Sequence, residues 1–205
     1  MPKTSTDPGL VRHALHGPPM GTRWSALFFA PPGLDPAPVQ QALQAAVAAV
    51  DAQMSTWRPD SDLMRLNRMP VGQWASLAPD LALVLALGLA IGRASGGAFD
   101  IGQGDAGRAW GFGPDPADPQ AIRAARAAAR SPAHERLELV DGSRLRKTAP
   151  IALDLNGIAK GHGADRLAEV LLAHGIAGAL VGIDGEMRAL GLRPDGAPWA
   201  VAVEA

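Results

Sequence analysis

Tight turns between predicted strands constrain the fold of this chain more than any other sequence feature. Residues 136–140 and 143–146 read as strands joined by an Asp-Gly pair, which is typical of two-residue hairpin turns. Residues 10–15 and 23–29 read as strands on either side of a cluster of Gly and Pro. Strands joined this closely run antiparallel. Because helical segments are mixed with these hairpins, the sequence predicts an α+β fold rather than a doubly wound parallel sheet.

Helical patterns account for much of the remaining sequence. Apolar residues recur every three or four positions in residues 38–54, and the apolar run at residues 81–91 is followed by Gly96-Gly97, a pair typical of helix C-termini. The stretch after Gly97 is predicted as a Gly-rich loop. The predicted helices cover residues 38–54, 61–68, 80–95, 118–130 and 161–174, and the other predicted strands cover residues 151–155, 178–183, 186–190 and 199–203.

The composition excludes several classes of protein. The 205 residues carry a formal net charge of -1 and are 47% hydrophobic, which is typical of a globular protein and not of a nucleic-acid-binding one. The absence of Cys excludes disulfides and thiolate catalysis. The longest apolar run is well short of the roughly 20 residues that cross a bilayer, and residues 1–17 show no export signal. We therefore expect one domain over residues 1–205, a cytoplasmic location, no membrane span and no nucleic-acid partner.

One block of the sequence is suited to binding phosphate. Residues 151–155 are predicted to run as an apolar strand into a turn with Gly157 and Gly161, where a helix starts. Backbone amides and Lys160 then converge on one point, a geometry that favours phosphate. The block is not a Walker loop, because Lys160 precedes its glycine. The alternative is an ordinary strand, turn and helix with an exposed Lys160 and a capping Asp.

A second block is rich in glycine. Gly96-Gly97 lets a ligand approach the backbone closely, and Ala98 and Phe99 offer amides and an apolar surface. Asp100 can accept hydrogen bonds from a ribose or a ring. The alternative is a glycine loop without a ligand.

Aromatic residues lie at two further places. Trp110 and Phe112 flank a glycine and can pack on an aromatic ligand, although local core is the alternative. Trp57 lies on the turn after residues 38–54, where its indole can stack on a planar ring or anchor the helix end. Met20 lies on a loop ahead of the strand at residues 23–29, which can expose it.

In this order, the blocks resemble the FAD:protein FMN transferase family, the ApbE-type flavin transferases. The resemblance spans Leu10 to the C-terminus and implies an ApbE/T-fold-like α+β fold with mixed sheets and packed helices, incomplete at the C-terminus. The segments that carry it are Met20-Gly21-Thr22, Ser55-Thr56-Trp57 with Ser61, Leu66 and Asn67, Gly97-Ala98-Phe99-Asp100 with Trp110-Gly111-Phe112-Gly113, and Asp154 to Asp165 with Gly182-Ile183-Asp184-Gly185-Glu186.

The resemblance also implies the residues of the site. It implies that magnesium is held partly by the backbone carbonyl of Gly157, and it identifies no catalytic side chain. The residues implied to contact FAD, the substrate, are Met20, Trp57, Ala98, Phe99, Asp100, Asp154 and Lys160.

The implied reaction is magnesium-dependent transfer of FMN from FAD to a threonine hydroxyl of an acceptor protein, with release of AMP. Some members of the family instead hydrolyse FAD to FMN and AMP. The alternatives are a non-catalytic FAD-binding protein and an inactive truncated remnant. We expect the segment that supplies the remaining metal ligands to be missing after residue 205. The sequence leaves the acceptor protein and the oligomeric state open.

Overall fold

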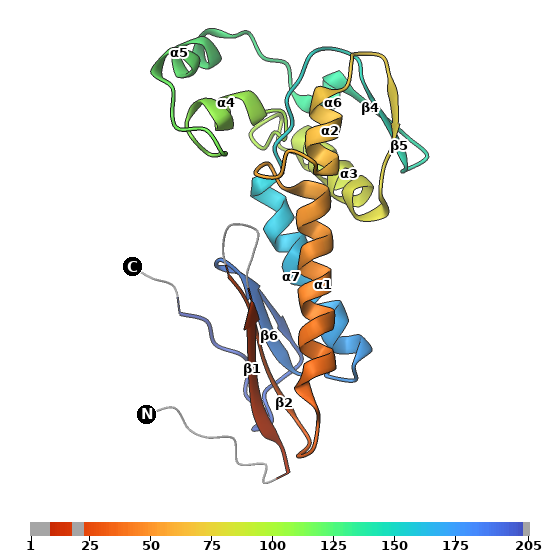
Figure 1. Ribbon diagram of the computed structural model, residues 1–205, viewed down its shortest axis with the longest axis vertical. Coiled ribbons are helices and arrows are strands. Elements are labelled where there is room, and N and C mark those ends of the chain that lie inside the picture. The colour runs from red at the N-terminus through yellow and green to blue at the C-terminus, as the bar shows by residue number, and fades with distance from the viewer. Residues whose placement is uncertain (1–8, 18–22, 203–205) are drawn as a thin grey trace. The chain divides into compact units, whose positions relative to one another are not determined.

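The chain divides into two compact units (Figure 1). The computed structural model describes residues 9–17 and 23–202. Unit 1 comprises residues 1–49 and 160–205, and unit 2 comprises residues 50–159. The chain therefore enters and leaves unit 2 once, and each unit has its own helices and strands.

Two long helices contain the points where the units divide. They are α1 (Pro36–Met54) and α7 (Asn156–Ala173). Within the described part of the chain, no helix is long and apolar enough to cross a membrane. The expected cytoplasmic location stays a prediction. The single domain over residues 1–205 also stays a prediction, because the two compact units need not correspond to separate domains.

Unit 1 is built on a four-stranded antiparallel sheet with the order β1-β2-β6-β7. Asp184 and Gly185 make the turn between β6 and β7 and both have positive φ, 51° and 102°, as a tight hairpin of this kind requires. The strands are β1 (Val11–Gly17), β2 (Trp24–Ala30), β6 (Ala179–Ile183) and β7 (Glu186–Leu190). The four strands predicted here and the α+β class are confirmed.

Buried and more exposed residues alternate along β2, and the buried ones form part of the core of unit 1. Trp24 and Phe28 are fully buried, and every second residue of the strand points to the same face. They pack with Leu43 of α1 and Leu167 of α7, and Figure 1 shows these two helices alongside the sheet. The burial of this apolar face by two helices stabilises the unit.

Unit 2 combines a three-stranded antiparallel sheet, with the order β3-β5-β4, and several helices. Helix α3 ends at the predicted glycine pair: the Gly96 amide bonds to the Arg93 carbonyl and the Gly97 amide to the Gly92 carbonyl, a Schellman motif. The elements are α2 (Asp62–Arg68), β3 (Trp74–Ser76), α3 (Pro79–Ala94), α4 (Gly104–Ala109), α5 (Pro119–Ala127), α6 (Ala133–Arg136), β4 (Leu137–Val140) and β5 (Arg144–Lys147).

The predicted strand at residues 151–155 is wrong, since these five described residues form no strand. The Asn67 side chain takes both backbone groups of Leu153: Nδ2 donates to the carbonyl at 2.9 Å and Oδ1 accepts from the amide at 2.7 Å. Two isolated backbone hydrogen bonds join the segment to residues 101–104. A side chain thus satisfies groups that a neighbouring strand would satisfy in a sheet.

Helix α7 begins earlier than predicted, at Asn156 rather than at Gly161. The Asp154 carboxylate accepts a hydrogen bond from the Asn156 amide at 2.7 Å, which satisfies one of the amides left free at a helix start. Gly157 and Lys160 therefore lie inside the first turns of the helix, not in a turn that precedes it.

The segment predicted as a Gly-rich loop after Gly97 contains helix α4. Its Gly104 and Gly107 are three residues apart and so lie on one face. A Cβ at Gly104 would lie 2.7 Å from the Leu153 carbonyl oxygen, and one at Gly107 would lie 3.1 Å from Asp154 Oδ2. The glycines thus allow α4 to approach the segment before α7 closely.

The predicted strand at residues 199–203 is not found, because residues 199–202 form no strand and residue 203 lies outside the described residues. The Trp199 Nε1 donates to the Leu190 carbonyl at 3.0 Å, and its ring centroid lies 6.1 Å from that of Phe29. A tryptophan side chain therefore holds this segment to the sheet of unit 1 without a backbone ladder.

Candidate functional site

A cavity of about 400 Å³ in unit 2 brings three of the predicted segments together. Thr56 and Asn67 come from the second segment, Phe112 and Gly113 from the third, and Asp154 from the fourth. These segments are far apart in the sequence. Because they meet in this cavity, we take it as the candidate functional site.

One wall of the cavity is fixed by Asn67. The two hydrogen bonds between its side chain and the Leu153 backbone fix the position of Leu153, which directly precedes Asp154. The Asn67 backbone carbonyl accepts a hydrogen bond from Lys147 Nζ at 2.9 Å. Lys147 is buried, and burial lowers the pKa of its amine. At the other end of α2, the Ser61 hydroxyl accepts from the Met64 amide at 3.1 Å and caps the helix. A buried amine and a capped helix therefore position this wall.

Asp154 contributes a partly buried carboxyl group to the cavity. Burial raises its pKa, against the opposing effect of hydrogen bonds from the backbone amide and side-chain amide of Asn156. A Cβ built on Gly107 would lie 3.1 Å from Asp154 Oδ2, so α4 approaches this carboxylate closely. Asp154 thus caps the start of α7, as the alternative reading of this block expects, and it also lines the cavity.

Thr56 contributes a hydroxyl group that is buried and has no hydrogen-bond partner in the described residues. A buried hydroxyl without a partner is destabilising, and Thr56 is also one of the residues that line the cavity. Trp57 follows it and is 55% exposed. The indole is therefore open to stacking, and its own backbone amide bonds to the Ser55 hydroxyl at 3.2 Å.

The aromatic residues Trp110 and Phe112 do not form local core. Trp110 is 52% exposed and Phe112 is 69% exposed, and Phe112 lines the cavity. A large apolar side chain held at the surface of a cavity offers a packing surface to a planar ligand. The local-core alternative for these two residues is wrong.

The loop after α3 is organised by Asp100. Its carboxylate accepts from the amides of Gly102 and Ala133 at 3.0 and 2.9 Å and from the Gln103 side chain at 3.3 Å. Asp100 is not part of the cavity lining, and Ala98, two residues before it, is exposed. The predicted contacts of Asp100 and Ala98 with FAD stay predictions.

Phe99 packs against the start of α7. A Cβ on Gly157 would lie 3.3 Å from the Phe99 ring, so glycine at this position leaves room for the ring. The Phe99 amide donates to the Ser95 hydroxyl at 3.1 Å. The structure therefore brings together one residue predicted to contact FAD and the residue predicted to contact magnesium.

Lys160 belongs to unit 1, where its ammonium group is paired. Its Nζ lies 2.9 Å from Asp184 and 3.6 Å from Glu186, both at the turn between β6 and β7. The hydrogen bond that Lys160 Nζ donates to the Asp184 carboxylate raises the pKa of Lys160. Lys160 is thus partly exposed and ion-paired, and its predicted contact with FAD stays a prediction. Met20 lies outside the described residues.

The described residues do not by themselves provide a magnesium site. Within residues 9–17 and 23–202, no three His, Cys, Asp or Glu side chains are grouped so that they could hold a metal ion. Magnesium requires a near-octahedral set of oxygen ligands, and the carbonyl of Gly157 would be one of these.

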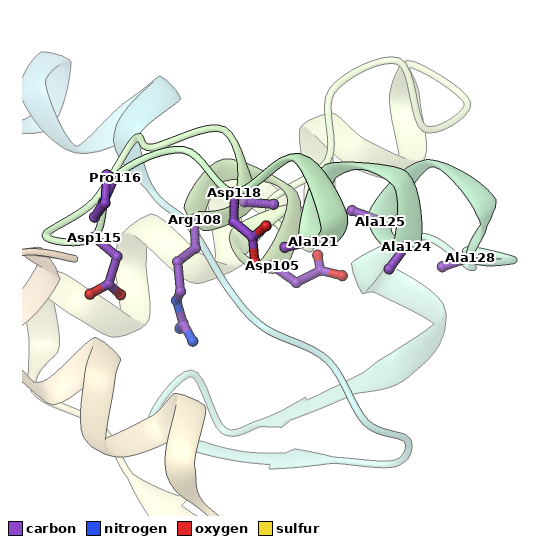
Figure 2. A pocket seen from close by; sticks show the side chains of 10 residues that line it. Asp105, Arg108, Asp115, Pro116, Asp118, Ala121, Ala124, Ala125 and Ala128 are labelled. Carbon is purple, nitrogen blue, oxygen red and sulfur yellow. The ribbon is translucent and has the colours of Figure 1, made fainter.

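A larger cavity of about 550 Å³ lies between α4 and α5 (Figure 2). Alanines of α5, among them Ala124 and Ala125, line it, and no residue predicted to bind FAD or magnesium does. Figure 2 shows Arg108 at the end away from these alanines. Arg108 and Asp115 line both cavities, so the two cavities share a wall.

Comparison with known proteins identifies the family. The ApbE family profile matches residues 20–205. The chain belongs to the ApbE family. The FAD:protein FMN transferase of Vibrio cholerae serotype O1 is 34% identical over 197 residues, which are 93% of this chain and 58% of that protein. The FAD:protein FMN transferase of Klebsiella pneumoniae is 31% identical over 213 residues, which are 98% of this chain and 59% of that protein.

Solved structures of ApbE proteins have the same fold. The flavin transferase ApbE from Vibrio cholerae matches 95% of this chain and 64% of its own with a TM-score of 0.84 at 32% identity. The apo form of the flavinyl transferase ApbE from Pseudomonas stutzeri matches 95% of this chain and 66% of its own with a TM-score of 0.81 at 32% identity. The chain thus spans about six-tenths of the length of the ApbE relatives named above.

Two cavity residues, Arg68 and Arg108, carry no signal in the sequence. Both lie on short helices, α2 and α4, where an arginine is most simply read as part of a solvated face. The cavity shows their position, which no ApbE motif in this sequence predicts.

Proposed function

We propose that the chain binds FAD in the cavity of unit 2 and, with magnesium, transfers FMN to a threonine hydroxyl of an acceptor protein, releasing AMP. The observation that carries this proposal is the meeting of three ApbE segments in one cavity. The FAD:protein FMN transferase names of its relatives give the reaction class.

The chemistry of the cavity supports a ligand of this kind. Its volume of about 400 Å³ lies in the range of small-molecule sites, so it suits part of a dinucleotide. It offers the unpartnered hydroxyl of Thr56, the exposed ring of Phe112 and the guanidinium groups of Arg68 and Arg108. Hydroxyl, ring and cation match the ribityl, planar and phosphate parts of FAD.

The proposed reaction exchanges one phosphorus–oxygen bond for another. The threonine oxygen bonds to the phosphorus of the FMN part, the bond from that phosphorus to the AMP phosphate oxygen breaks, and the hydroxyl proton passes to solvent. Such a transfer depends on holding the phosphates and the nucleophile in line. Magnesium, when bound, would offset the negative charge of these phosphates.

A second candidate is non-catalytic binding of FAD. The observation that favours it is that the described residues contain no group of side chains that could hold a metal ion. Hydrolysis of FAD to FMN and AMP is a variant of the first candidate, in which water replaces the threonine hydroxyl.

One experiment separates these functions. The chain is incubated with FAD, Mg²⁺ and an acceptor that bears a target threonine, with the acceptor's Thr→Val variant as the control. Covalent flavin on the acceptor together with AMP supports transfer, whereas free FMN with AMP supports hydrolysis. Bound and intact FAD supports the second candidate, and the absence of any flavin binding by the folded chain refutes all three.

A further inference from the structure

We propose that Arg68 and Arg108 hold the pyrophosphate of FAD in the cavity of unit 2. This inference rests on the proposed function and names the residues that recognise the charged part of the substrate. Both guanidinium side chains line the cavity that also contains Asp154 and Phe112.

Arg68 is anchored but not neutralised. It is the last residue of α2, and its Nη2 donates to the Pro59 carbonyl at 2.7 Å. A guanidinium has five N–H donors, so one neutral acceptor leaves most of them available. The structure gives Arg68 no carboxylate partner among the described residues.

Arg108 lies on α4, and its side chain has no hydrogen-bond or ion-pair partner in the part of the chain that the structure describes. Figure 2 shows its side chain extending away from α5, and it belongs to the wall that the two cavities share. It is exposed, so a ligand can reach it. A cation that lines a cavity without a protein anion is suited to a ligand anion.

Several other arginines of unit 2 behave differently. They form ion pairs with nearby carboxylates: Arg58, Arg65, Arg130, Arg144 and Arg146. Arg93 and Arg123 resemble the proposed pair in having no carboxylate partner within the described residues, but they do not line the cavity. These two serve as matched controls.

The charges of the cavity agree with a pyrophosphate ligand. A pyrophosphate diester carries two negative charges, and each guanidinium can donate two parallel hydrogen bonds to phosphate oxygens. Asp154 and Asp115 also line the cavity. The Asp154 carboxylate accepts hydrogen bonds from both amides of Asn156, which offset part of its charge, and Asp115 is exposed to solvent that screens its charge.

The test compares ligands with and without phosphate. FAD and riboflavin are titrated by flavin fluorescence, and ADP is titrated by displacement of FAD, against the unmodified chain and the variants Arg68→Gln, Arg108→Gln and their double variant. We expect each single substitution to raise the Kd for FAD and ADP by about tenfold. The Kd for riboflavin should stay within about twofold, because riboflavin has no phosphate.

The controls are Arg93→Gln and Arg123→Gln, which should leave every Kd unchanged. Circular dichroism and the melting temperature confirm that each variant is folded. Unaltered FAD affinity in the folded double variant would overturn the inference and leave the proposed function standing. Equal losses for FAD and riboflavin would also overturn it, because the arginines would then shape the cavity rather than bind phosphate. If the unmodified chain binds no FAD, the proposed function fails first.

Discussion

Thr56 places a buried hydroxyl without a partner at the edge of the cavity. Since an unsatisfied buried hydroxyl costs free energy, we expect Thr56→Val to raise the free energy of unfolding by about 1 kcal/mol. We expect the same substitution to weaken FAD binding about fivefold, because the valine cannot bond to the ligand. Urea denaturation and fluorescence titration measure the two effects.

Thr56→Ser is the control for this prediction, because it keeps the hydroxyl and loses a methyl group. It should retain the FAD affinity of the unmodified chain. A destabilised Thr56→Val variant would mean that the hydroxyl is already satisfied, for example by water. The opposite signs for stability and binding distinguish a ligand-directed group from a packing group.

Lys147 is the buried titratable group behind the cavity wall. Burial lowers its pKa in the folded state below the ordinary value of 10.5, so between these two pKa values the unfolded chain binds more protons. The stability contributed by this group therefore rises with pH through that interval. We expect Lys147→Met to remove this rise, measured as the difference between the two proteins in urea unfolding from neutral pH to pH 10.5.

Lys160 provides the contrast, because its hydrogen bond with Asp184 raises its pKa above 10.5. Its contribution to stability is present below 10.5 and is lost as the pH rises through the higher folded pKa. The difference between the unmodified chain and Lys160→Met should thus fall with pH only in the more alkaline range. Identical slopes for the two lysine variants would contradict the burial of Lys147.

Among the elements, the hairpins and amphipathic helices could be predicted from the sequence, whereas the segment before α7 could not. Residues 151–155 carry the apolar pattern of a strand, but Asn67, more than eighty residues away in the sequence, takes the backbone groups of Leu153. Local pattern contains no information about that distant side chain. The sequence predicts the start of α7 too late for a related reason. Gly157 lies in the helix and leaves room for the Phe99 ring, and it is not part of a turn.

Helix α4 depends on Gly104 for its contact with the segment before α7. A Cβ there would lie 2.7 Å from the Leu153 carbonyl oxygen, a backbone atom that moves only with its segment. We expect Gly104→Ala to lower the free energy of unfolding by about 1–3 kcal/mol, although alanine favours helix. Urea denaturation measures the change, and the FAD affinity should fall with it because Gly104 lines the cavity.

Gly161 in α7 is the matched control for Gly104→Ala. Nothing lies within 4 Å of a Cβ built there, so Gly161→Ala should raise the free energy of unfolding by about 0.5–1 kcal/mol through helix propensity alone. If both substitutions stabilised the chain, the close approach of α4 to Leu153 would be wrong.

For the whole molecule, the order of the motifs was sufficient to predict the family but not the site. The cavity of unit 2 gathers Thr56, Phe112 and Asp154, and of these three only Asp154 is predicted to contact FAD. Asp100 organises a loop and Lys160 lies in unit 1. Which residues share a cavity depends on long-range packing, which a motif does not encode. The arginines of the cavity escape sequence reasoning for the same reason.

Binding of FAD should stabilise the chain as a whole through linkage. At a free FAD concentration of about 100 times Kd, the folded state gains about 2.7 kcal/mol, which corresponds to a rise of about 5–10 °C in melting temperature for a chain of this length. The double variant Arg68→Gln/Arg108→Gln should show a smaller rise at the same FAD concentration, because a smaller fraction of it is bound.

The segments that bound FAD stabilises most can also be predicted. The cavity is lined by residues of unit 2 alone, so amide hydrogen exchange with FAD present should slow in residues 56–68 and 104–115 by local closure. Residues 24–30 and 179–183, in the sheet of unit 1, have a fully buried core face and should slow only to the extent that the two units unfold in one transition. Slower exchange confined to unit 1 would place the FAD site elsewhere, because a ligand protects first the segments that it contacts.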